Sequence, residues 1–359
     1  MKLDRGIKVS IFLVAMVLVL SISVFAASKE RIDKFEAVQI ALEDSIDLEI
    51  AKLDLANAKL TYQRSQAENL INQSVYSNLE AQRNLLQAQK DYYQSQTGLI
   101  NQVLTEYSEL ILLNKKLKLT EKKVELEKSL LDKVELAVKR GYKDDLELLK
   151  QKNDYNEILL SLEELSDDYQ EKLINLKLTL DLNTEQNLNL QTWSLEKIWK
   201  LDKAEIIASA VKNSFDLQVK EEVVELAQRE LERAQQVSTP KLDLQELENN
   251  LKIAKLEKES SKKELIITIE QDYYSFKQAI KKIDSEEAKS AASREEYQLV
   301  QQEQEKGLKS ADDLLSAEIE FLEAEYNYQA AIVDYYLNRL QLQIDMGLQV
   351  EVLLDEIKL

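Results

Sequence analysis

Residues 33–48 of this chain read DKFEAVQIALEDSIDL, and residues 202–217 read DKAEIIASAVKNSFDL. Seven of the sixteen positions are identical at a constant offset of 169 residues. Further along, KRGYK at residues 139–143 is followed 166 residues later by EKGLK at residues 305–309. A period this long does not build a solenoid, whose repeats have about 20–50 residues. The sequence therefore predicts two tandem copies of one large unit.

Each copy carries the pattern of long helices. In the first copy, apolar residues follow one another at seven-residue intervals: Val103, Leu110, Leu117, Val124, Leu131 and Val138. A sustained seven-residue repeat implies about 3.5 residues per turn and a left-handed supercoil against neighbouring helices. A second stripe predicts neighbours on two sides, as in a bundle or a closed ring, and consists of Leu112, Leu119 and Leu126.

Glycine and proline, which tight turns require, are nearly absent. The 359 residues include five Gly and one Pro. Sandwiches, barrels and doubly wound α/β folds need many turns built from these two residues, so we expect none of them. The sequence instead predicts an all-α fold with little or no β structure, in which long helical hairpins form a coiled-coil-like bundle or a helical barrel.

The predicted hairpins turn at two matching glycines. Gly141 and Gly307 each follow a basic residue, as is typical of helix C-termini. Asp144 or Ser310 then supplies N-cap chemistry for the returning helix. We therefore expect a first helical repeat at 27–190 with its tip near residue 141, and a second at 191–359 with its tip near residue 307.

A second interruption of the helical pattern is expected in each copy, away from the tip. In the second copy it surrounds Pro240, with helical pattern up to about Gln235 and again from about Gln245. Its counterpart in the first copy is expected within residues 65–78.

The composition excludes most catalytic chemistry. The chain contains no Cys and no His, which removes thiol nucleophiles, thiolate metal ligands and the commonest general base. We expect no catalytic, cofactor-binding or metal-binding residues, and no enzyme activity. The formal net charge is −19, so the acidic surface repels nucleic acid, which is not an expected partner.

The first residues have the pattern of a secretory signal peptide. A short basic segment precedes an apolar run from Ile11 to Phe25, and Val24-Phe25-Ala26 supplies small residues where a signal peptidase cleaves. The apolar run is short for a membrane span, which needs about 20 residues. The pattern predicts a signal peptide at 1–26 and an exported protein, with an uncleaved anchor as the alternative.

Two helical hairpin units behind a signal peptide resemble the TolC-type outer-membrane efflux proteins. The resemblance covers the whole chain after the signal. It is carried by the two opening helices quoted above, by GLKSADDLLSAE at residues 307–318 and by LQLQIDMG at residues 340–347. It implies a trimer that forms a hollow periplasmic cylinder at the outer membrane. It also implies two partners, a periplasmic adaptor protein and an inner-membrane transporter.

The resemblance also assigns roles to individual residues. In the family the glycine hairpins form the periplasmic end, so the residues implied in adaptor docking are Gly141, Tyr142, Lys143, Asp144, Gly307, Leu308, Lys309 and Ser310. Acidic residues after the second glycine line the closed aperture in some members, which implies this role for Asp313 and Asp312. The alternative for both carboxylates is charge stabilisation of a helix N-terminus.

The sequence departs from the family pattern in two places. The family's Arg-Tyr pair ahead of the second glycine is replaced by Glu303-Gln304. Each family copy also inserts two membrane-crossing strands, and such a hairpin needs roughly 25 residues. The interruptions at 65–78 and 236–244 leave less room than this, so we expect a divergent member without a complete barrel. The alternative function is an exported coiled-coil spacer without a transport lumen.

Overall fold

The computed structural model describes residues 32–72, 75–185, 188–200 and 202–358. The predicted signal peptide lies outside these residues. The first copy contains helices α2 (Lys34–Asp44), α3 (Ile46–Asn72), α4 (Val75–Lys139) and α5 (Asp145–Thr179). The second contains α6 (Lys203–Asn213), α7 (Phe215–Gln236), α8 (Lys241–Glu305) and α9 (Ala311–Asp345), and α10 (Val350–Lys358) follows. In the described part of the chain the only β feature is an isolated bridge between Ile32 and Leu190. The prediction of an all-α fold is confirmed.

The two copies match in the lengths of their helices. Helices α2 and α6 have 11 residues each, α4 and α8 have 65 each, and α5 and α9 have 35 each. At 1.5 Å per residue, α4 and α8 are each roughly 100 Å long. Helices α3 and α7 differ, with 27 and 22 residues respectively.

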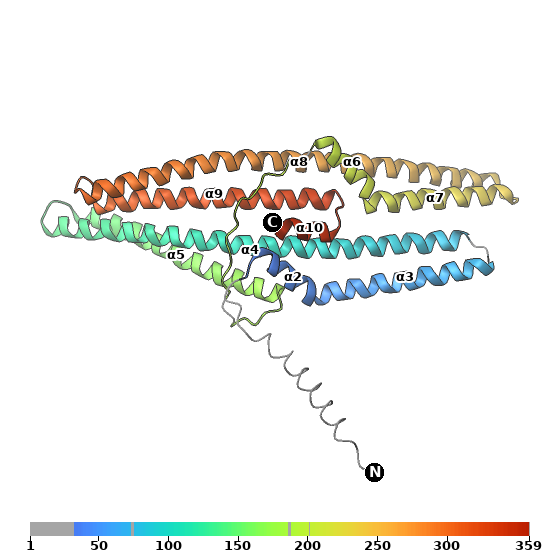
Figure 1. Ribbon diagram of the computed structural model, residues 1–359, viewed down its shortest axis with the longest axis horizontal. Helices are drawn as coiled ribbons and strands as arrows, with labels where there is room; N and C mark the ends of the chain where they lie inside the picture. Colours follow the sequence, from blue (N-terminus) through green and yellow to red (C-terminus); the bar gives the residue numbers. More distant parts are fainter. Residues whose placement is uncertain (1–31, 73–74, 186–187, 201, 359) are drawn as a thin grey trace, which may run out of the picture.

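The long helices form one elongated layer (Figure 1). On the side of the hairpin tips the order across the layer is α5, α4, α9 and α8, and neighbours in this order pack against one another. On the other side the order is α3, α4, α7 and α8. Helix α8 therefore forms one edge along the whole layer, and α3 and α5 share the opposite edge.

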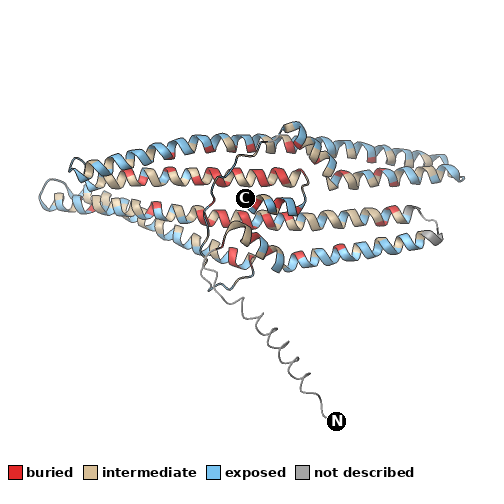
Figure 2. Cartoon of the chain, in the orientation of Figure 1, coloured by how far each residue is buried: buried red, intermediate tan, exposed pale blue. Residues whose placement is uncertain are grey.

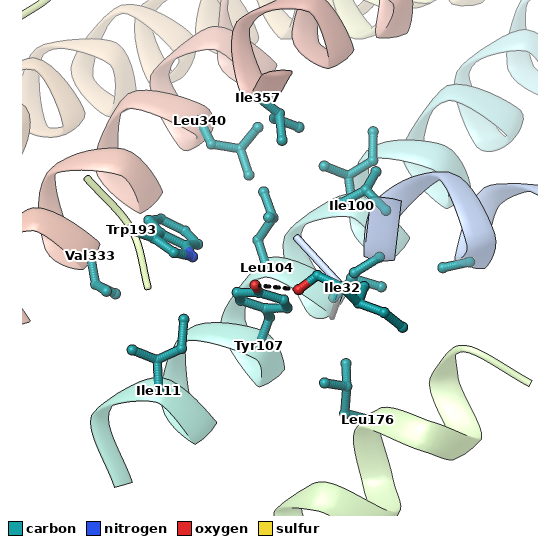
Figure 3. Close-up of a cluster of buried hydrophobic side chains, with 14 of the residues drawn as sticks. Ile32, Ile100, Leu104, Tyr107, Ile111, Leu176, Trp193, Val333, Leu340 and Ile357 are labelled. Atoms are coloured by element: carbon teal, nitrogen blue, oxygen red, sulfur yellow. Dashed lines mark hydrogen bonds between the residues drawn. The ribbon is translucent and has the colours of Figure 1, made fainter. Parts of the chain in front are cut away.

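The core lies in the middle of the layer, where the buried residues gather (Figure 2). There α2, α10 and the linker between the copies pack against α4 and α9. Buried apolar side chains from five segments meet in this cluster, including Ile32, Leu104, Leu176, Trp193 and Leu340 (Figure 3). The middle of the molecule is therefore held mainly by hydrophobic burial.

One buried tyrosine fastens the linker to this core. Tyr107 of α4 is fully buried, and its hydroxyl lies 2.9 Å from the carbonyl oxygens of both Ile32 and Gln191. The same hydroxyl accepts a hydrogen bond of 2.8 Å from the backbone N–H of Gln191. Figure 3 shows the bond from Tyr107 to Ile32. Two segments far apart in the sequence are thus tied to one helix.

The second interruption of each copy is shorter than expected. Helix α3 continues to Asn72 and α4 begins at Val75, so the expected break across residues 65–78 is wrong in its extent. In the second copy α7 ends at Gln236 and α8 begins at Lys241, close to the predicted limits around Pro240. The segment before residue 72 lacks apolar periodicity, yet its polar residues are compatible with an exposed helix.

Candidate functional site: the hairpin tips and the open edges

The two hairpin tips have the same backbone geometry. Gly141 and Gly307 both have φ of +74°, in the left-handed region that glycine adopts without strain. The N–H of Tyr142 donates to the carbonyl of Ala137, and the N–H of Leu308 donates to that of Glu303, each at 2.9 Å. This 6→1 bond defines a Schellman motif and satisfies a free carbonyl at the helix end. The predicted turns at the two glycines are present.

The tips present their side chains to solvent. Tyr142 is 80% exposed and Leu308 is 71% exposed, which is unusual for large apolar groups. Lys143 and Lys309 follow them and are also exposed. Each tip thus combines one apolar side chain with one cation, a combination suited to a partner with an apolar and acidic surface.

Short side-chain caps start the returning helices. The Asp144 carboxylate accepts from the N–H of Glu147 at 2.9 Å. Ser310 and Asp313 form a reciprocal capping box: the Ser310 hydroxyl accepts from the N–H of Asp313 at 3.1 Å, and the Asp313 carboxylate accepts from the N–H of Ser310 at 2.8 Å. This backbone bond, more than the neighbouring lysines, lowers the pKa of Asp313. Asp313 remains exposed and charged at the tip.

Asp312 connects the two hairpins. Its carboxylate forms an ion pair with Lys133 and accepts a hydrogen bond of 2.7 Å from the hydroxyl of Ser129, both on α4. These bonds, that of Lys133 first, lower the pKa of Asp312. The N-terminal turn of α9 is therefore tied to α4 of the other copy, near the tips.

The edges of the layer carry apolar side chains that no helix of the same chain covers. On α3 these are Ile46, Ile50, Leu53 and Leu60, between 53% and 75% exposed. On α8 they are Leu242, Ile253, Leu256, Ile267 and Tyr274, between 52% and 79% exposed. Within each set the residues are separated by the three- and four-residue steps of a heptad pattern. On α5 the exposed residues include Leu146, Leu149, Leu160 and Ile174.

Such stripes are typical of helices that pack against another helix. Both edges of the layer are therefore suited to lateral association. No helix in the described residues is both long enough and apolar enough to cross a membrane.

The structure was compared with known proteins at this point. No protein-family model matches the sequence, and no curated protein matches it either. Solved structures do match. The Campylobacter jejuni CmeC outer membrane channel is 14% identical with a TM-score of 0.63, over 87% of this chain and 85% of that one. The outer membrane protein VceC of Vibrio cholerae is 12% identical with a TM-score of 0.60, over 87% of this chain and 95% of that one.

The chain has the fold of these outer-membrane proteins. The open state of the Neisseria gonorrhoeae MtrE outer membrane channel gives the same result, with 16% identity, a TM-score of 0.58 and 88% of each chain covered. The fold that the TolC resemblance implies is therefore confirmed. The similar structures are channels rather than enzymes.

Proposed function

We propose that this chain is the TolC-like component of an efflux or secretion system. Several copies associate side by side into a helical conduit at the outer membrane or in the periplasm, and the hairpin tips dock on an adaptor protein and an inner-membrane pump. The fold shared with outer-membrane channels supports the conduit.

The observation that carries this proposal is the pair of open edges. A single layer of helices with an apolar stripe on each edge leaves both stripes in water. Contact of the α8 edge of one copy with the α3 and α5 edge of the next covers both. This contact is heterologous, so it repeats around a ring until the ring closes. The proposed ring contains three copies, as the TolC resemblance implies.

The tips have two roles in this proposal. Tyr142 and Leu308 supply apolar anchors for the adaptor, with Lys143 and Lys309 beside them. Asp313, which is exposed, lines the closed aperture. Asp312 holds the two hairpins of one copy together through Lys133.

Light scattering coupled to size exclusion tests the ring. The sample is the chain without its predicted signal peptide, residues 27–359, with and without detergent. We expect a mass of three copies. The double variant Ile253→Glu/Leu256→Glu places two charges on the α8 stripe and should reduce the mass to that of one copy. The control Gln235→Glu/Gln236→Glu adds the same charge to exposed residues of α7, which lies inside the layer.

Two results would contradict the proposal. One is a single-copy mass for the unmodified chain at all concentrations. The other is equal behaviour of the stripe variant and the control. A dimer that persists in the stripe variant would favour the alternative of a coiled-coil spacer without a lumen.

A further inference from the structure

Three buried nitrogen atoms without hydrogen-bond partners line one pocket. They are Nε1 of Trp193, Nε of Arg339 and Nε2 of Gln343, and none has a partner within the described residues. The three side chains are only 5%, 8% and 3% exposed. Their residues share a pocket of about 20 Å³ between the linker, α9 and α10. All three groups are hydrogen-bond donors, so the pocket lacks an acceptor that only a ligand or water could supply.

Figure 3 shows how the tryptophan contributes. Its indole nitrogen lies on the side of the ring that faces Leu104, which also lines the pocket. Leu340 and Ile357 line the pocket as well. The donors are therefore set in apolar surroundings, where hydrogen bonds and charges act more strongly than in water.

A cation without an ion-pair partner stands at the same pocket. The Lys34 ammonium lies 4.7 Å from the centre of the Tyr336 ring and 5.7 Å from that of Trp193. Among the described residues no carboxylate forms an ion pair with it. Burial, together with the Arg339 charge, lowers the pKa of Lys34, although Glu196 partly opposes this. An anion bound here would stabilise the charged ammonium.

Wider space adjoins the pocket on its aromatic side. Tyr336, Arg339 and Glu356 belong both to the small pocket and to a neighbouring one of about 560 Å³. The larger pocket is lined also by Ile198 and Trp199, and the Arg339 guanidinium lies 5.4 Å from the Trp199 ring. Its walls suit an apolar or aromatic group.

We propose that this site binds an organic carboxylate with an apolar body. The carboxylate accepts hydrogen bonds from Trp193, Arg339 and Gln343, and its charge lies near Lys34. The body extends over Ile198 and Trp199 in the larger pocket. The site lies in the middle of the molecule, away from the tips, and does not depend on the proposed transport function.

Intrinsic fluorescence reports directly on this site. The chain contains two tryptophans, Trp193 and Trp199, and both line these pockets. The full chain is titrated with octanoate, and separately with 1-octanol, which has the same apolar body without the charge. We expect a saturable change of emission with octanoate and at least tenfold weaker binding of 1-octanol. Isothermal titration calorimetry measures the same affinities independently of the tryptophans.

Two variants and one control distinguish a binding site from a water-filled gap. Gln343→Glu replaces a donor by a carboxylate and should weaken octanoate binding at least tenfold. Gln349→Glu makes the same change at an exposed residue between α9 and α10 and should leave binding unchanged. If Gln343→Glu does not fold by circular dichroism, Lys34→Met removes the half-buried charge instead, with the same expected loss.

The proposal is overturned by any of three results. These are no saturable binding of octanoate by either method, equal affinity for octanoate and 1-octanol, or unchanged octanoate affinity in a folded Gln343→Glu or Lys34→Met variant. The three donors would then be satisfied by ordered water alone, for which the small pocket has room.

Discussion

The duplicated chain offers an internal control for the tyrosine that fastens its linker. Tyr107 and Tyr273 are 166 positions apart, the offset that relates α4 to α8. The hydroxyl of Tyr107 contacts the backbone of Ile32 and Gln191, whereas no hydrogen bond of the Tyr273 hydroxyl is found among the described residues. Replacing each tyrosine by phenylalanine therefore removes the same atom from two different settings.

The expected cost of Tyr107→Phe follows from the bonds that are lost. The hydroxyl donates one hydrogen bond and accepts one, each contributing about 1 kcal/mol net. After the change the carbonyl of Ile32 still accepts from Gln191 N–H at 3.3 Å, but the carbonyl of Gln191 loses this partner. An unsatisfied buried carbonyl costs about 1–3 kcal/mol, part of which the two lost bonds already contain. We expect a loss of about 2–3 kcal/mol for Tyr107→Phe and less than about 0.5 kcal/mol for Tyr273→Phe.

Urea unfolding at one fixed protein concentration measures both costs, because association changes apparent stability. Hydrogen exchange at the Gln191 amide should also become faster in Tyr107→Phe and remain unchanged in Tyr273→Phe. Equal costs for the two variants would refute the reasoning, since the Tyr107 hydroxyl would then not hold the linker.

Three further changes have expected outcomes. Gly141→Ala should cost about 1 kcal/mol because its φ of +74° disfavours a side chain, whereas Gly98→Ala, in an exposed turn of α4, should stabilise by about 0.5–1 kcal/mol; thermal unfolding that shifts both in one direction would contradict this. Asp312→Asn should cost at most about 1 kcal/mol at pH 7. Because Lys133 lowers the pKa of Asp312, the difference between Asp312→Asn and the unmodified chain should disappear as the pH falls below about 4, and a difference that persists at pH 2 would argue against the ion pair. Burial, with a neighbouring carboxyl, raises the pKa of Asp345 to about 7, so its folded state favours the proton and the chain should lose stability as the pH rises from about 4 through 7. Asp345→Asn should therefore raise the urea midpoint at pH 8 and leave it nearly unchanged at pH 4, and equal midpoints at pH 8 would refute the burial of a charge there.

Local features of this structure could be predicted from the sequence. The turns at Gly141 and Gly307 need only a glycine at a helix end, and the Ser310–Asp313 capping box needs only two residues three positions apart. Both are decided within one turn of helix. The heptad spacing in α4 likewise predicted long helices because the pattern repeats along one segment.

Features that join distant segments could not be predicted in the same way. The partner of Asp312 is Lys133, 179 positions earlier, and this pairing depends on which faces of α4 and α9 meet. The open edges were also missed, because an apolar stripe reads the same whether a neighbour covers it or not. Helix α3 was expected to end early, since the sequence before Asn72 has helix-forming residues without a buried face.

The unequal lengths of α3 and α7 have a geometric consequence. Helices α4 and α8 are equally long, but α3 has five residues more than α7, which corresponds to roughly 7 Å along the axis. The two halves of each chain are therefore not interchangeable at the end opposite the tips. A ring of three such chains would have a rim whose contour repeats every 120° rather than every 60°. Any molecule that fits this rim along its whole circumference would share that threefold periodicity.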